Sequence, residues 1–167
     1  KAIQDGFTKY TPATGIPQLK KAICDKLERD SGLKYDPSQV VVNCGAKHTI
    51  FDAVMSLLNE GDEAIIPAPY WVSYADQVKL MGGKPVIVET KPENGLKMTA
   101  EELKAALSPR TKFLLLNSPS NPHGAVYSET ELAALAGALA DTDIYIISDE
   151  IYEKIIYGVR CHSIAQM

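Results

Sequence analysis

Short apolar runs alternate with helix-like patterns along the 167-residue chain. Each run has four or five residues, which is the length of a buried strand, and most of the runs are rich in β-branched side chains. The five runs are residues 40–44, 64–67, 85–88, 113–116 and 144–147. Between them, apolar residues recur three or four positions apart, which indicates amphipathic helices. The pattern therefore predicts five strands, each separated from the next by a helix.

The predicted helices carry start and stop signals. A break at Thr11–Gly15 precedes the first helix, and Ser31 and Gly32 end it, because glycine is common just past a helix. Thr99 and Glu102 match a capping box, in which each side chain bonds the backbone amide of the other residue. The predicted helices are residues 16–31, 50–58, 72–81, 99–107 and 128–139.

This order of elements predicts an α/β fold, in which helices flank both faces of a mostly parallel sheet. The length of 167 residues suits one domain with a substantial core. In a parallel sheet the carboxyl ends of the strands share one edge, and ligands bind there. Residues that directly follow the apolar runs are therefore the candidates for function.

Composition and charge exclude several classes of protein. A net charge of -4 argues against a nucleic-acid partner, and no apolar run approaches the roughly 20 residues needed to span a bilayer. Three widely spaced cysteines, Cys24, Cys44 and Cys161, favour reduced thiols in a cytoplasmic protein. The histidines are isolated from one another, so a metal site is not expected. The absence of an initiator Met suggests that residues precede Lys1.

Two candidate binding positions follow the first two apolar runs. Gly45, Ala46 and Lys47 follow the first run and open a predicted helix. The free amides and partial positive charge of a helix N-terminus suit a phosphate, although Gly45 could instead serve only a tight turn. Trp71, the only tryptophan, follows the second run and could stack on a planar ring or fill the core.

Polar residues follow the fourth and fifth runs. Asn121 lies in Asn117–Gly124, where two prolines and a glycine could hold its amide rigidly or simply form a turn. Asp149 could meet a protonated ring nitrogen, which would offset the cost of burying it, or it could cap a helix. Tyr152 lies close behind. Together with the predicted helix N-terminus at residues 45–47 and the ring of Trp71, these residues would suit a cofactor that carries a phosphate group and a protonatable aromatic ring.

With these residues in place, the sequence resembles a known family. Segments Tyr10–Pro17, Asn121–Gly124 and Ser148–Tyr152 resemble those of fold-type-I, class I pyridoxal-phosphate-dependent aminotransferases, in particular the bacterial aspartate aminotransferases. The similarity covers essentially all 167 residues. Asn121–Gly124 is similar to the family's Asn-Pro-Thr-Gly signature, with His123 in place of threonine. In the family, the cofactor contact comes from the asparagine.

The resemblance implies that pyridoxal 5'-phosphate is the cofactor and assigns its phosphate contacts. The backbone amides of Ala46 and Lys47 match those that hold the phosphate in the family, and Gly45 precedes them. Tyr10 matches a tyrosine whose hydroxyl reaches the phosphate of the neighbouring subunit. A homodimer with shared sites is therefore implied.

The resemblance also assigns the contacts to the cofactor ring. Trp71 matches the aromatic residue that stacks on the pyridine, and Asp149 matches the carboxylate that pairs with its nitrogen. Asn121 and Tyr152 match the pair that hydrogen-bond the phenolic oxygen. A protonated pyridine nitrogen lets the ring accept electrons when the Cα–H bond of the substrate breaks.

Other functional parts of the family are expected outside this sequence. The Schiff-base lysine, and the arginine that binds the substrate α-carboxylate, are expected beyond Met167. Residues 1–167 are therefore expected to be truncated at both ends relative to the family, to contain no catalytic residue, and to be inactive alone. Strands contributed after Met167 are implied to lie between the predicted strands 40–44 and 144–147.

Three functions are consistent with these features. The leading hypothesis is a transaminase that moves an amino group between an amino acid, first of all aspartate, and 2-oxoglutarate. A lyase or decarboxylase could use the same cofactor on the same fold. A non-catalytic remnant, which binds the cofactor weakly or serves as an interaction module, is the third.

Overall fold

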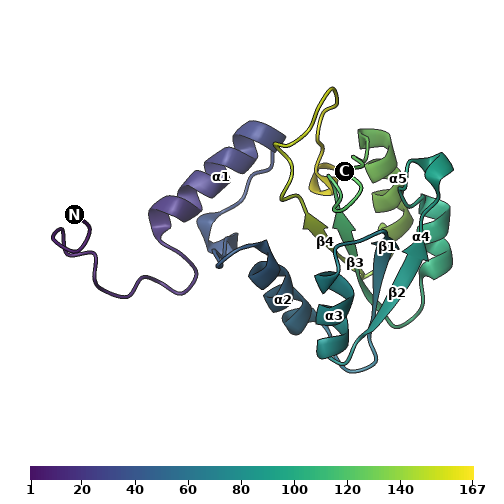
Figure 1. The fold of residues 1–167 in the computed structure, drawn as a ribbon, viewed down its shortest axis with the longest axis horizontal. Helices are drawn as coiled ribbons and strands as arrows, with labels where there is room; N and C mark the ends of the chain where they lie inside the picture. The colour runs from purple at the N-terminus through teal and green to yellow at the C-terminus, as the bar shows by residue number, and fades with distance from the viewer. The chain divides into compact units, whose positions relative to one another are not determined.

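The computed structural model describes residues 1–167 and comprises two compact units, Lys1–Gly45 and Ala46–Met167 (Figure 1). In the first unit, helix α1 covers Pro17–Ser31. It ends where predicted, because Gly32 adopts the left-handed conformation that closes helix C-termini. A short 3₁₀ helix, Pro37–Gln39, follows it. That the 167 residues form one domain stays a prediction.

Residues 40–44 do not form the predicted strand, and that prediction was wrong. A β-branched run favours extended backbone, but a strand also needs a neighbour that pairs with its amides and carbonyls. Here the Val42 amide donates to the Thr14 carbonyl at 3.0 Å, within a loop. Gly15 permits this close approach, because a Cβ there would lie 2.7 Å from the Val42 side chain. Val41 is exposed.

The second unit contains a sheet of four strands in the order β2-β1-β3-β4, and all neighbouring strands are parallel. The strands are β1 (Glu63–Ala68), β2 (Lys84–Glu89), β3 (Thr111–Asn117) and β4 (Tyr145–Asp149). They correspond to the second to fifth predicted strands, so the predicted α/β fold class is confirmed. The register pairs Asn117, the last residue of β3, with Asp149, the last residue of β4. Two polar side chains thus share the carboxyl edge.

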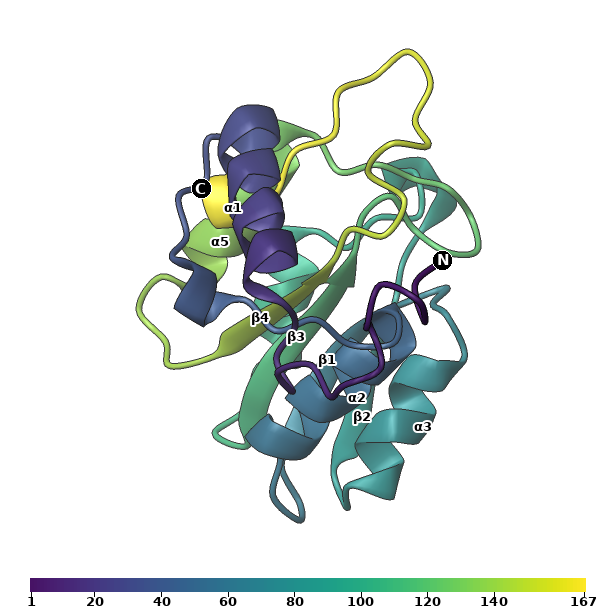
Figure 2. The same ribbon diagram turned by 90° about the vertical axis from the view of Figure 1, so that its left-hand side faces the viewer.

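Helices cover both faces of this sheet. They are α2 (Ala46–Leu57), α3 (Ser73–Leu80), α4 (Ala100–Ala106) and α5 (Glu129–Leu139), together with 3₁₀ helices at Pro92–Asn94 and Ile164–Gln166. Helices α2 and α3 lie side by side on one face, and α4 and α5 lie on the other (Figures 1 and 2). The predicted capping box at the start of α4 is confirmed by bonds of 2.8 and 3.2 Å between Thr99 and Glu102.

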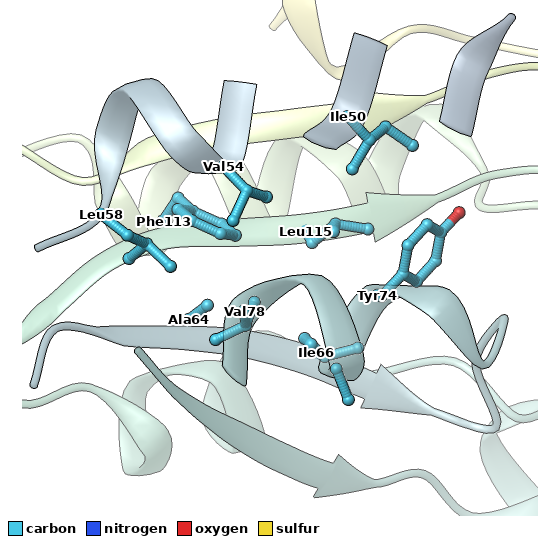
Figure 3. Close-up of a cluster of buried hydrophobic side chains, with 10 residues drawn as sticks. Ile50, Val54, Leu58, Ala64, Ile66, Tyr74, Val78, Phe113 and Leu115 are labelled. Atoms are coloured by element: carbon cyan, nitrogen blue, oxygen red, sulfur yellow. The ribbon is translucent and has the colours of Figure 1, made fainter. Parts of the chain in front are cut away.

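The strands bury side chains on both faces. Ile66 and Leu115 pack under α2 and α3, whereas Ile65 and Leu114 pack under α4 and α5. Each such fully buried side chain stabilises the fold by roughly 1.5–3 kcal/mol. Figure 3 shows the first cluster, with Tyr74 beside the arrowhead of β3 and its hydroxyl directed away from the other side chains. None of the helices has the length and apolar character required to cross a membrane.

Candidate functional site

A cavity of about 280 Å³ opens at the carboxyl ends of β3 and β4. Its walls come from the first turn of α2, the start of α3, and the loops that follow the two strands. The lining residues are Ala46, Lys47, Trp71, Tyr74, Asn117, Asn121, Asp149, Ile151 and Tyr152. Six of the residues proposed from the sequence therefore line one cavity.

Asn117 organises the loop that carries Asn121. Its amide nitrogen donates to the carbonyl of Asp149 at 2.9 Å and to that of Pro119 at 3.1 Å. Its side-chain oxygen accepts the Asn121 amide at 2.7 Å. These bonds fix the position of Asn121 relative to the end of β4. Sequence reasoning assigned no role to Asn117, because a strand-ending asparagine can also simply begin a turn.

Both carboxylate oxygens of Asp149 have hydrogen-bond donors. The Tyr74 hydroxyl donates to Oδ2 at 2.6 Å, and the Ile151 amide donates to Oδ1 at 3.1 Å. The second bond caps a turn, whereas the alternative interpretation expected Asp149 to cap a helix, and no helix directly follows β4. The first bond comes from a buried tyrosine that sequence reasoning missed.

Tyr74 is a neutral, fixed donor. Burial, and then the hydrogen bond to Asp149 and the charge of that carboxylate, raise the pKa of Tyr74 far above its ordinary value of 10.0. Its ring packs in the core beneath α2 and α3. The sequence shows that Tyr74 lies about one helical turn after Trp71, but it does not show the bond to Asp149, which is 75 positions away.

The aromatic wall of the cavity is held from two sides. The Trp71 ring meets the Tyr74 ring edge to face, with centroids 5.4 Å apart and planes at 81°. The Lys47 ammonium lies 4.9 Å from the centroid of the Trp71 ring. Trp71 packs against the core cluster and also lines the cavity. Lys47 is the only Lys or Arg that lines the cavity, so its side chain contributes a positive charge to the site. The sequence had suggested a role only for its backbone amide.

Two further polar groups converge on the cavity. The Asn121 amide nitrogen donates to the Tyr152 hydroxyl at 3.4 Å, a long bond that leaves both groups able to bind a shared acceptor. His123, which replaces the threonine of the family signature, does not line this cavity. It accepts the Ala125 amide at 3.3 Å, and burial lowers the pKa of its imidazole. His123 therefore supports the loop as a neutral side chain.

Two predicted site residues belong to the first unit. Gly45 has a φ of 104°, which side-chain-bearing residues rarely adopt, so the turn before α2 requires glycine there. Tyr10 is fully exposed, so no core packing of its own chain holds it. The roles of both toward a cofactor stay predictions.

Comparisons with known proteins identify relatives of this chain. The model of the family "Aminotransferase class I and II" matches residues 1–166. The aspartate aminotransferase of Bacillus sp. (strain YM-2) is 51% identical over 99% of this chain and 43% of its own length. The aspartate/prephenate aminotransferase of Cereibacter sphaeroides is 53% identical over 94% of this chain and 40% of its own length. The Thermus thermophilus aspartate aminotransferase structure with maleate superimposes with a TM-score of 0.95, at 43% identity, over 99% of this chain and 43% of that one.

The chain therefore belongs to the class I and II aminotransferase family, whose members depend on pyridoxal phosphate. It spans about 43% of the length of the curated relatives it matches. The residues of the cavity fit this cofactor, because they offer an indole wall (Trp71) and a carboxylate with two fixed donors (Asp149). The start of α2, with the Lys47 ammonium, suits the phosphate.

Proposed function

We propose that the protein is a pyridoxal-phosphate-dependent transaminase that exchanges an amino group between aspartate and 2-oxoglutarate. The observation that carries the proposal is the Asp149 carboxylate, held by Tyr74 at 2.6 Å in the same cavity as Trp71 and Asn121. A carboxylate fixed in this way is suited to keep a pyridine nitrogen protonated. The bound cofactor then supplies an electron-accepting ring.

The residues of the cavity would each contact a different part of the cofactor. The amides of Ala46 and Lys47, in the first turn of α2, would bind the phosphate, since helix N-termini attract anions. Trp71 would hold the plane of the ring, an orientation effect on the bond to be broken. Asn121 and Tyr152 would donate to the phenolic oxygen, and Asp149 would hold the proton on the ring nitrogen.

The substrate proposal rests on the relatives. Two are described as an aspartate and an aspartate/prephenate aminotransferase, and the Thermus structure was determined with maleate, a dicarboxylate. Prephenate is therefore a second candidate amino acceptor.

The lysine that links the cofactor covalently is proposed to lie outside residues 1–167, as the resemblance implies. A polypeptide of these residues alone would then bind the cofactor without a covalent bond and would not transaminate. We also propose that the whole protein is a homodimer, in which Tyr10 contacts the phosphate of the partner subunit.

The test is an assay of the full-length protein loaded with pyridoxal phosphate. Aspartate and 2-oxoglutarate should yield oxaloacetate and glutamate in equal amounts, and prephenate should be compared as acceptor under the same conditions. Release of carbon dioxide without amino transfer would favour a decarboxylase. Absence of any turnover by the loaded, folded protein would favour the non-catalytic remnant.

A further inference from the structure

A buried glutamine connects the two helices that frame the cavity. Gln77 lies on α3, one turn after Tyr74, and only 8% of it is exposed. Its Nε2 donates to the backbone carbonyl of Lys47 at 3.1 Å, in the first turn of α2. This bond therefore reaches the segment proposed to seat the phosphate.

The other end of the Gln77 side chain has no comparable contact. The amide oxygen of Gln77, Oε1, is buried and has no hydrogen-bond partner. Leaving a buried acceptor unpaired costs stability, and such a group calls for an explanation. The neighbouring contacts between α2 and α3 are apolar, and Val54 and Val78 are fully buried among them. A methionine of similar size would pack there without an unpaired oxygen.

The position of Gln77 links two parts of the site that belong to different helices. The phosphate seat is the first turn of α2, whereas Trp71 lies just before α3 and Tyr74 lies in its first turn. Lys47 makes two contacts between these parts. Its backbone carbonyl accepts a hydrogen bond from the Gln77 side chain, and its ammonium lies 4.9 Å from the centroid of the Trp71 ring. A ligand that carries a ring and a phosphate must satisfy both parts at once, so their spacing sets its affinity.

We propose that Gln77 is a positioning residue that fixes the spacing between the phosphate seat and the Trp71 wall. The inference rests on the proposed function, because it requires a phosphorylated ring ligand. Without the bond, each part can still bind its own fragment of the ligand. What is lost is the advantage of binding both fragments in one molecule.

The experiment compares three ligands on the cofactor-free, full-length protein and its Gln77→Met variant. The probes are pyridoxal phosphate, pyridoxal and inorganic phosphate. We expect Gln77→Met to weaken the binding of pyridoxal phosphate about tenfold. The dissociation constants of pyridoxal and of inorganic phosphate should change by no more than about twofold. Melting temperature should stay level or rise, because the unpaired oxygen is gone. Gln18→Met, at an exposed position of α1, is the matched control.

The outcomes separate the two proposals. If the parent protein does not prefer pyridoxal phosphate to pyridoxal, the proposed function fails, and the role of Gln77 fails with it. If the parent has this preference and Gln77→Met keeps it in full, only the positioning role is overturned. Equal weakening of all three ligands with a lower melting temperature would show a merely structural glutamine. Gln77→Leu provides the same comparison should the methionine variant not fold.

Discussion

Asp149 combines a structural contact with the proposed chemical one. Its Oδ1 accepts the Ile151 amide, whereas Oδ2 accepts the Tyr74 hydroxyl. In the full-length protein, Asp149→Ala should lower kcat by at least one to two decades. The reason is that a charge-assisted hydrogen bond is worth about 1.5–3 kcal/mol, before any electronic effect on the ring is added. Circular dichroism checks the fold. A folded variant with near-parental kcat would mean that Asp149 only caps a turn.

Tyr74 offers a finer test, because one atom can be removed. Tyr74→Phe keeps the buried ring and leaves Oδ2 of Asp149 without its donor. We expect kcat to fall by roughly tenfold, since a buried hydrogen bond to a charged group is lost. Burial and Asp149 raise the pKa of Tyr74, so its hydroxyl stays protonated at working pH. The alkaline limb of the pH–rate profile should therefore not move in Tyr74→Phe.

The matched control for this variant is Tyr145→Phe, at a tyrosine that is 54% exposed. It should leave kcat unchanged. An alkaline limb that shifts in Tyr74→Phe alone would show that Tyr74 titrates, which contradicts its assignment as a neutral donor.

Residues that follow apolar runs could be found from the sequence, and those inside elements could not. Trp71, Asn121 and Asp149 each come within a few residues of a strand end, and strand ends share an edge in a parallel sheet. Tyr74 and Gln77 lie within α3 and look like ordinary helical residues. Their partners are 75 and 30 positions away along the chain, so only the packed structure reveals them.

At the scale of elements, Glu63 joins the amino ends of the strands. Its carboxylate accepts the Ser108 hydroxyl at 2.6 Å and the Lys84 ammonium at 2.9 Å. Ser108 first, and then Lys84, lower the pKa of Glu63 below its ordinary 4.5. Because the pKa of Glu63 is lower in the folded state, its carboxylate stabilises the fold at pH values above its ordinary pKa. This stabilisation is lost as the pH falls through the folded-state pKa.

Glu63→Gln should therefore lower the melting temperature at pH 7 by a few degrees, about the effect of one charge-assisted hydrogen bond. The difference from the parent should shrink as the pH falls below the ordinary carboxyl value. Thermal denaturation at pH 7 and pH 3 measures both, with exposed Glu60→Gln as control. A difference that persists unchanged in acid would mean that the charge of Glu63 is not responsible.

Strand prediction succeeded for the apolar runs that pair with another strand of this chain. Four of the five apolar runs pair in parallel, and their alternate residues fill two cores. Residues 40–44 also begin with an apolar, β-branched run, but no strand pairs with them, and Val42 bonds a loop carbonyl instead. Propensity is a local property and strand pairing is not, so the local pattern cannot decide between these cases.

For the whole molecule, the fully exposed Tyr10 bears on the proposed homodimer. If each site takes Tyr10 from the partner subunit, two inactive variants can restore one another. A hybrid dimer of Tyr10→Ala and Asp149→Ala subunits contains one site with both residues intact and one with neither. Random mixing makes about half of the dimers hybrid, so about a quarter of parental activity should return.

The measurement is kcat per site after the two full-length variants are unfolded and refolded together, with each variant refolded alone as control. If Tyr10 serves the site of its own chain, every site in the hybrid carries one defect. Mixing would then give only the average of the two variants. A monomeric full-length protein would likewise rule out a shared site. Recovery above that average requires Tyr10 and Asp149 to reach the same cofactor from different subunits.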